Sequence, residues 1–445
     1  MCRPSGCKPL LAAIVSFVAG GVFPVGAAAD ELSLESTRWL VIHAGTVLPV
    51  PGKPPRENAT IIVRNGRIVE IRDGRIDAAQ IVTDTSSAHI ETLELPDKFV
   101  LPGLMDMHVH LSAEVGVTGQ LNHGASEEYA LEHKSGMADT YDLVTAMGNA
   151  HKTLQAGYTT VRDVGSEGWH IFALRDAIDD GNIAGPRILA AGSIIHPGAE
   201  SGPGACSGIE SCRRITREQI DMGADVIKVR TSCRGSLPCG YETAPSIFLE
   251  DELRAIIQTA ATRGLKVAAH AHGTAAIDLA ASLGVDSIEH GSFNDEESRR
   301  IMRKNDVYLV PTLSVQDNIH RDIVTATGTM RAIMQNFLDK HGQGMLAAHK
   351  AGVKIAAGSD AGISKNGNNA HELEYYVEYG LTPEEAIIAA TVNAADLIGM
   401  GDELGTLEPG KIADLIAVDV NPLENISALK NVSLVIQGGQ IVKAP

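Results

Sequence analysis

Hydrophobic and polar positions alternate at both ends of the chain and follow a different pattern between them. From residue 39 to 90, runs such as ATIIVRNGRIVEIRDG alternate apolar with polar residues, and Asn-Gly and Asp-Gly dipeptides separate them. This pattern is typical of strands joined by tight hairpin turns. Residues 411–445 repeat it in KIADLIAVDVNPL and SLVIQGGQIVKAP. We therefore expect one small β domain that takes strands from both ends of the chain.

The middle of the chain alternates strand-like with helix-like segments, the latter including DELRAIIQTAATRG. The strand-like runs are FVLPGLMDMHVHL, TTVRDVG, RILAAG, DVIKVR, KVAAHAH, VDSIEHG, VYLVPTL and VKIAAGSD. Eight such units in succession fit a (β/α)8 TIM barrel. The predicted fold class is therefore α/β, with a (β/α)8 barrel at 100–399. Residues 30–99 and 400–445 would build a small β-sandwich domain from both termini.

Residues 1–29 have the features of a secretory signal peptide. Arg3 and Lys8 precede the apolar run PLLAAIVSFVAGGVF, and the small residues of GAAAD follow it. This order is typical of a signal cleaved near Ala29, and the run is short for a membrane span. A buried N-terminal helix or an uncleaved anchor is the alternative. We expect a periplasmic or secreted protein that has no contact with the membrane after cleavage.

The charge of the chain argues against two classes of partner. The whole chain has 37 basic and 55 acidic residues, a net charge of −18. The first 29 residues carry two basic residues and no acid, so 35 basic against 55 acidic residues leave −20 in the mature chain. Nucleic acids and anionic membranes are bound through clustered Lys and Arg. We therefore expect neither as a partner.

Cysteine usage agrees with export. Each of two pairs has five residues between its members, in loops rich in Gly, Ser and Pro. The four residues are Cys206, Cys212, Cys233 and Cys239. An even number of cysteines in short loops of an exported chain indicates disulfides, whereas this spacing is poor for a zinc site of four thiolates. We expect two disulfides, and the sequence leaves their pairing open.

Residue types that bind metals recur at the ends of the predicted barrel strands. His108 and His110 end the first strand and lie on the same side of it, because side chains alternate along a strand. At the ends of later strands stand Lys228, His270, His272, His290 and Asp360. A single His in an apolar run is more often a core residue, and an Asp after Gly-Ser is more often a helix cap. Their recurrence at the rim where such barrels have their active sites favours a metal centre.

With these residues in place, the chain resembles the amidohydrolase superfamily of the binuclear metal type. The resemblance covers nearly the whole mature chain, in VLPGLMDMHVHL, VIKVR, VAAHAHG, SIEHG, AAGSD and LGTLEPGKIADLIAVDVNPL. It implies two zinc ions per chain. His108 and His110 would bind the more buried ion, and His270 and His290 the more exposed one.

The resemblance also implies roles for Lys228 and Asp360. Lys228 would be N-carboxylated and bridge the two zinc ions, which explains a lysine inside the apolar run VIKVR. Burying an ammonium is costly, whereas two metal cations would neutralise a carbamate. Asp360 would bind the buried ion and carry a proton from the attacking hydroxide to the departing amine.

Within the superfamily, AGYTTVRDVG, VAAHAHG and HELEYYVEYGLTPEEAIIAATVNAADLIG are most similar to one branch. This branch holds Xaa-Pro and other Xaa-amino-acid dipeptidases, imidazolonepropionase-like proteins and ochratoxin-hydrolysing amidases. The similarity implies hydrolysis of an amide between an acyl group and an amino acid with a free carboxylate, as in dipeptides, N-acyl amino acids and ochratoxin A. It also implies a homo-oligomer, and we expect an octamer. A lactonase or cyclic-amide hydrolase is the nearer alternative, and a deaminase with one metal is the more distant one.

Further residues at the same rim are candidates for substrate binding. They are Arg230, His272, His196 and Tyr241. Arg230 and His272 each lie two residues beyond a predicted ligand, and Arg is suited to pairing with a carboxylate. Dipeptidases of the branch often have Tyr in place of His272 and a glycine-rich run in place of residues 230–240, so substrate specificity does not carry over. We interpret Arg162 and Asp163, at the end of the second strand, as a structural pair.

Overall fold

The computed structural model of the protein describes residues 37–81, 88–115, 121–122, 138–166, 168–198, 203–232, 242 and 244–445. The predicted signal peptide and three predicted residues, Cys233, Cys239 and Tyr241, lie outside these ranges. No helix in the described ranges is both long and apolar enough to cross a bilayer.

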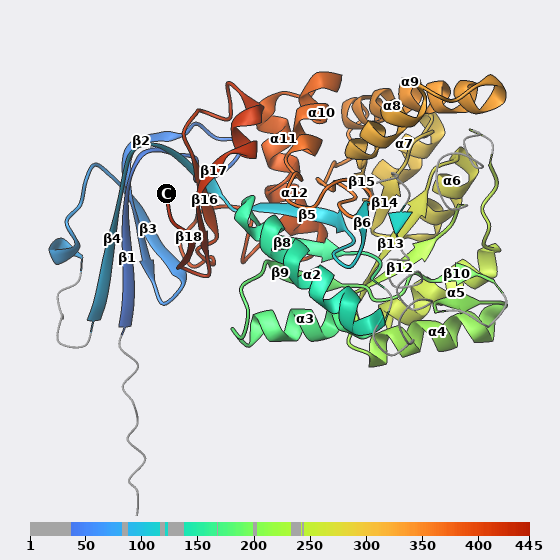
Figure 1. Cartoon of the computed structure of the whole chain (residues 1–445), viewed down its shortest axis with the longest axis horizontal. Coiled ribbons are helices and arrows are strands. Elements are labelled where there is room, and N and C mark those ends of the chain that lie inside the picture. The colour runs from blue at the N-terminus through green and yellow to red at the C-terminus, as the bar shows by residue number, and fades with distance from the viewer. Residues whose placement is uncertain are drawn as a thin grey trace, which may run out of the picture. The chain divides into compact units, whose positions relative to one another are not determined.

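The small domain contains strands from both ends of the described chain (Figure 1). The strands are β1 (Thr37–Val47), β2 (Arg56–Arg64), β3 (Arg67–Asp73), β4 (Ala88–Pro102), β16 (Leu415–Val418), β17 (Val432–Gln437) and β18 (Gln440–Lys443). They form a seven-stranded sheet in the order β18-β17-β16-β4-β1-β2-β3. β4 joins the two groups, since it pairs in parallel with β1 and antiparallel with β16.

The turns and the core of this sheet follow from the sequence pattern. Asn65 and Gly66, with φ angles of 48° and 79°, connect β2 to β3, as the Asn-Gly dipeptide predicts. Buried side chains from strands of both ends share one apolar core, which includes Leu40, Ile61 and Leu415. The expectation of a β-sandwich domain built from both termini is therefore confirmed.

The strands of the barrel follow one another in chain order. They are β5 (Leu104–Val109), β8 (Tyr158–Asp163), β9 (Arg187–Ala190), β12 (Val226–Arg230), β13 (Lys266–Ala271), β14 (Ser287–His290) and β15 (Tyr308–Val310). β5-β8-β9 and β12-β13-β14-β15 are parallel sheets. The amide of Ile195 donates to the carbonyl of Lys228 and joins the two sheets. The segment 354–361 supplies the eighth strand position, because it bonds to Leu309 on one side and to His108 on the other. The predicted barrel is thus closed.

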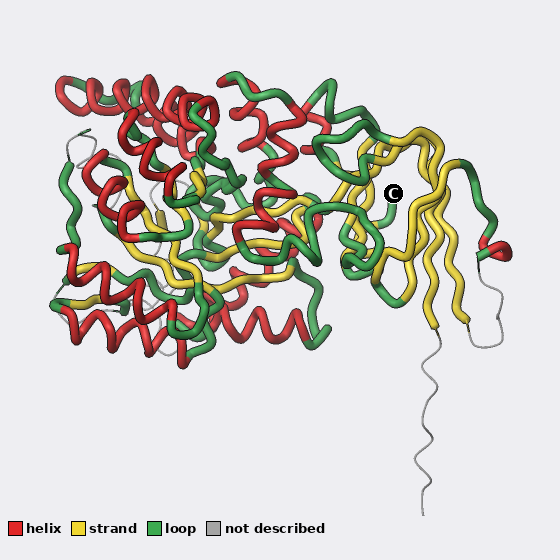
Figure 2. Tube along the Cα trace, turned by 180° about the vertical axis from the view of Figure 1, so that it is seen from behind, coloured by secondary structure: helices red, strands yellow, loops and turns green. Residues whose placement is uncertain are grey.

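Helices lie outside these strands, as Figure 2 shows. They are α2 (Ala138–Gln155), α3 (His170–Asp179), α4 (Ile209–Asp221), α5 (Glu250–Ala261), α6 (Thr274–Leu283), α7 (Glu296–Lys304), α8 (Gln316–Asp322), α9 (Gly328–Lys350), α10 (His371–Tyr379), α11 (Pro383–Ala389) and α12 (Val392–Leu397). Sequence signals at the N-terminus mark where some of these helices begin. At α11, Thr382 and Glu385 form a capping box and Pro383 takes the first helical position.

Short elements occupy the connections. They are η1 (Ala78–Gln80), β6 (Glu114–Val115), β7 (Leu121–Asn122), β10 (His196–Pro197), β11 (Ala205–Cys206), η3 (Leu313–Val315) and η4 (Ile426–Lys430). Cys206 at the end of β11 forms a disulfide with Cys212 in α4, and both residues are buried. This bond is one of the pairings that the sequence left open.

Candidate metal centre

Three predicted ligands converge where β5 meets the eighth strand position. His108, His110 and Asp360 each offer a ligand atom, and these atoms lie within 4.8 Å of one another. The Nε2 atoms of the two histidines lie 3.5 and 3.3 Å from Oδ1 of Asp360. All three residues are buried. We call this set the first cluster.

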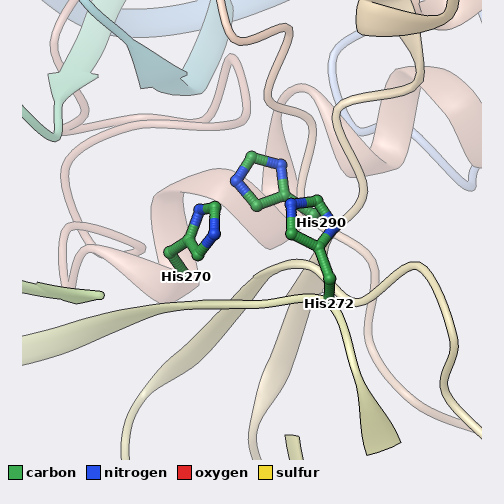
Figure 3. Close-up of side chains that lie close together, drawn as sticks. All are labelled: His270, His272 and His290. Carbon is green, nitrogen blue, oxygen red and sulfur yellow. The ribbon is translucent and has the colours of Figure 1, made fainter. Parts of the chain in front are cut away.

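A second cluster lies at the ends of β13 and β14. It consists of His270, His272 and His290, whose ligand atoms also lie within 4.8 Å of one another, and Figure 3 shows the three rings close together. The rings of His272 and His290 are stacked with centroids 4.7 Å apart. The ring of His290 lies 5.0 Å from that of His108, so the two clusters are neighbours.

Lys228 interacts with both clusters through its charge. The residue is 2% exposed, and Nζ has no hydrogen-bond partner in the part of the chain that the structure describes. Burial lowers the pKa of the ammonium to about 8. Its charge in turn acts on the histidines of both clusters, among them His108 and His290. Among the described residues, an amine without a hydrogen-bond partner thus lies next to two groups of metal-binding side chains, where its positive charge is costly to bury.

The backbone is strained where these side chains leave their strands. His290, Thr312 and Asp360 have φ angles of 69°, 58° and 53°, a region that non-glycine residues rarely adopt. Such conformations persist where the surrounding structure holds them, and they cluster at functional sites. At His290 the turn interrupts the alternation of side chains. As a result Glu289 and His290 both face the barrel interior although they are adjacent in sequence.

In the first cluster, each histidine has an Nδ1 contact to an oxygen that accepts hydrogen bonds. Nδ1 of His108 lies 2.7 Å from Oε2 of Glu289, and Nδ1 of His110 lies 2.8 Å from the carbonyl oxygen of Gly165. Burial alone would raise the pKa of Glu289, but Arg162 holds it well below its usual range, so the carboxylate is ionised. When a metal takes the place of the contact between Nε2 and Asp360, Nδ1 would carry the proton in both histidines and Nε2 would offer its lone pair to the ion.

Glu289 was not among the residues predicted from the sequence. It is the partner of Arg162, for which the sequence analysis expected Asp163. Arg162 donates from Nη2 to Oε1 of Glu289 at 2.9 Å and from Nε to the carbonyl of Met107 at 2.7 Å. Asp163 instead accepts from the amide of Leu111 at 2.8 Å. The predicted pair of Arg162 with Asp163 is therefore wrong. Neighbours on a strand point in opposite directions, and Arg162 points into the barrel.

Asp106 is a second buried carboxylate near the site that the sequence analysis did not predict. Its carboxylate accepts from the amides of His108 and Ser359, both at 3.0 Å, and from Nδ2 of Asn369 at 2.7 Å. Burial raises the pKa of Asp106 to about 6. These bonds tie the end of β5 to the residue that precedes Asp360. They thus hold the three members of the first cluster together.

In the second cluster, hydroxyl groups take the place of the carboxylate and the carbonyl. Nδ1 of His272 lies 2.8 Å from Oγ of Ser292, and Nδ1 of His290 lies 2.7 Å from Oγ1 of Thr312. A hydroxyl can donate or accept, so it does not decide which ring nitrogen carries the proton. Burial lowers the pKa of His272 to about 3, so its ring is neutral at pH 7 and able to bind a metal.

The candidates for substrate binding are in different surroundings. His272 belongs to the second cluster. Arg230 ends β12, two residues beyond Lys228, and is partly buried. His196 stands on β10, where its Nδ1 lies 3.1 Å from the carbonyl oxygen of Pro197, outside both clusters. Tyr241 lies outside the described residues.

Comparison with known proteins identifies the family. The model of the Amidohydrolase family matches residues 99–442. The chain is 31% identical to ochratoxinase from Aspergillus niger, over 93% of this chain and 88% of that protein. Among solved structures, a Xaa-Pro dipeptidase with methionine bound in its active site is 33% identical, with a TM-score of 0.80, and the match covers 91% of this chain and all of the other. The crystal structure of A. niger ochratoxinase has a TM-score of 0.78 and 29% identity, over 92% of this chain and 96% of the other. Membership of the family implies a hydrolase with a binuclear metal site, and the described residues supply two groups of candidate ligands. The chain therefore belongs to the amidohydrolase family.

Proposed function

We propose that this protein is a binuclear zinc amidohydrolase that uses a metal-bridging hydroxide. It would cleave the amide between an acyl group and an amino acid with a free carboxylate, in dipeptides, N-acyl amino acids and ochratoxin A. The observation that carries the proposal is the buried amine of Lys228, which has no hydrogen-bond partner among the described residues and lies beside two clusters of ligand atoms. The names of two relatives, an ochratoxinase and a Xaa-Pro dipeptidase, support the substrate class.

The two clusters would hold one ion each. His108, His110 and Asp360 would bind the more buried ion, His270 and His290 the more exposed one, and the carbamate of Lys228 would bridge them. Imidazole and carboxylate groups suit zinc. When bound, the ions would supply a shared hydroxide near neutral pH and polarise the carbonyl of the substrate.

Asp360 would move the proton. Although burial raises the pKa of its carboxyl group, the neighbouring His108 and His110 lower it below its ordinary value, so the group is ionised. Its Oδ1 lies 3.5 Å from Nε2 of His108 and 3.3 Å from Nε2 of His110, so an ionised oxygen that can accept a proton faces the first cluster. Asp360 would take this proton from the nucleophile and deliver it to the departing amine.

Arg230 would bind the free carboxylate of the substrate. It follows Lys228 by two residues on β12 and so stands at the same rim as the metal centre. A guanidinium pairs with a carboxylate through two parallel hydrogen bonds. This pairing would distinguish the terminal amino acid of a substrate from an internal peptide bond.

The test combines metal analysis with a substrate panel. We expect two zinc ions per chain and turnover of dipeptides, N-acyl amino acids and ochratoxin A. Arg230→Met should raise KM for these acids by about tenfold or more, with little change for their methyl esters, which should already be poor substrates.

Other outcomes would contradict the proposal. Faster turnover of lactones or cyclic imides would favour a lactonase or cyclic-amide hydrolase. One metal per chain would favour a deaminase. If Arg230→Met lowered activity equally on the acids and on their esters, Arg230 would not bind the carboxylate.

We also propose that the mature protein is exported to the periplasm or secreted and forms a homo-oligomer. The disulfide between Cys206 and Cys212 supports an oxidising compartment. Sequencing the N-terminus of protein from that compartment tests cleavage near Ala29, and light scattering measures the mass of the assembly.

A further inference from the structure

A pocket of about 650 Å³ lies outside the two metal clusters and is lined by four lysines. Its walls come from the end of α2, the loop after the eighth strand position, and the region from η4 to β18. The lysines are Lys152, Lys365, Lys430 and Lys443, and no carboxylate among the described residues lines the pocket with them. This concentration of positive charge stands in a chain whose net charge is −18. We call it the lysine pocket.

The four lysines differ in whether a carboxylate lies close to the ammonium group. Nζ of Lys430 lies 3.0 Å from a carboxylate oxygen of Glu374, outside the pocket lining. Nζ of Lys443 donates to the carbonyl of Gln155 at 2.9 Å, a neutral partner. The ammonium group of Lys365 forms neither a hydrogen bond nor an ion pair with the residues that the structure describes, and only its backbone carbonyl accepts, from the amide of Asn368 at 3.1 Å. Two ammonium charges, those of Lys365 and Lys443, are thus left without a described carboxylate.

We propose that the lysine pocket binds an anion of the phosphate class that carries more than one negative charge. Four ammonium groups around one pocket, three of them on exposed lysines, create a positive potential that attracts anions. Lysine is well suited to phosphate, which it binds as a point charge. Side-chain amides that can donate hydrogen bonds to phosphate oxygens complete the lining, namely those of Asn366, Asn368 and Asn431.

The loop of residues 361–369 connects this pocket to the metal centre. The loop starts directly after Asp360, contributes Lys365 to the pocket and ends at Asn369, whose amide donates to Asp106 at 2.7 Å. In between, Nδ2 of Asn366 lies 3.3 Å from the carbonyl oxygen of Ala113. An anion bound to Lys365 would therefore restrain a loop that is anchored to the first cluster at both ends.

Calorimetry with inorganic phosphate and tripolyphosphate tests the site on the full metal-loaded protein. We expect one tripolyphosphate per chain, bound more tightly than phosphate and more weakly as salt increases. Lys365→Gln combined with Lys443→Gln should lower the affinity by about tenfold or more. The control removes the same number of charges elsewhere, with Lys53→Gln and Lys304→Gln, both exposed. It should leave the affinity within about twofold.

Hydrogen exchange supplies a second readout that does not depend on hydrolysis. Tripolyphosphate should slow amide exchange in residues 361–369 and 430–433 of the wild type and leave exchange unchanged in the pocket variant. Absence of binding would overturn the proposal, and so would an equal loss of affinity in both double variants. Binding that persists in the pocket variant but disappears when the metal is removed would place the anion at the metal centre and also overturn it.

Discussion

The two clusters of the metal centre differ in what holds their imidazole rings. In the first, Nδ1 of His108 and Nδ1 of His110 face a carboxylate and a backbone carbonyl, which only accept hydrogen bonds. In the second, Nδ1 of His272 and Nδ1 of His290 face hydroxyl groups, which can also donate. The protein thus offers a pure acceptor to Nδ1 of both histidines in the first cluster, whereas at His272 and His290 the hydroxyl group leaves the ring tautomer open.

This difference has a thermodynamic consequence. An acceptor on Nδ1 fixes the ring orientation and raises the basicity of Nε2, and loss of such a partner weakens metal binding. We therefore expect the ion of the first cluster to be bound more tightly than that of the second. Titration with a chelator should remove the two ions in separate steps.

Lys228→Ala should have the largest effect, because Lys228 is the residue that we propose to bridge both clusters. We expect loss of most bound metal and a fall in kcat of roughly 10³-fold or more, as when a central catalytic group is removed. Elemental analysis and kinetics measure both effects, and short carboxylic acids should restore part of each. Lys304→Ala is the control at an exposed lysine. Full activity in Lys228→Ala would exclude the binuclear site.

Asp360→Asn should impair catalysis much more than folding. Asn tolerates the φ angle of 53° at this position, so the melting temperature should change by only a few degrees. The amide cannot take up a proton as the carboxylate does, and kcat should fall by roughly 10² or more. A kcat close to that of the wild type would mean that another group moves the proton.

Glu289→Gln should weaken the first cluster selectively. It removes the anion that faces both His108 and Arg162, so the affinity for the tighter ion should fall by about 10- to 100-fold. Arg162 would also lose its buried partner, at a cost of about 3–5 kcal/mol in the free energy of unfolding. Chelator titration and denaturant unfolding measure the two effects. Glu297→Gln, at an exposed ion pair with Arg300, should change neither.

Thr312→Val should have the smallest effect, confined to the second cluster. Valine keeps the shape of threonine but removes the hydroxyl that contacts His290. The affinity for the weaker ion should fall by about tenfold or less, while the tighter ion keeps its affinity. A loss of affinity as large as that of Glu289→Gln would show that the protein holds the rings of the two clusters equally firmly.

The sequence predicted the positions of the candidate ligands better than the groups around them. Polar residues at the ends of apolar runs indicated the rim, and the structure brings His108, His110 and Asp360 together there. The role of Glu289 was hidden, because strict alternation places it on the face opposite His290. Only the positive φ angle of His290 turns both side chains inward.

The sequence also predicted some features of the fold better than others, because local patterns do not show which distant segments pair. The alternation of strands and helices predicts a barrel because parallel strands need crossover connections. The order of the small sheet depends on contacts between distant segments, such as β4 with β16. Local patterns carry no information on such pairings, and likewise none on the partner of Arg162, which lies 127 residues away.

The place of β4 in its sheet also governs how the chain completes its fold. β4 ends at Pro102, whereas β16, its neighbour on one side, begins at Leu415. Until the last strands have joined the sheet, β4 therefore has an unpaired edge. Such edges pair readily with other chains and promote aggregation. The last strands to be synthesised cover this edge, so a truncation before Leu415 would leave the barrel encoded in full and the protein prone to aggregate.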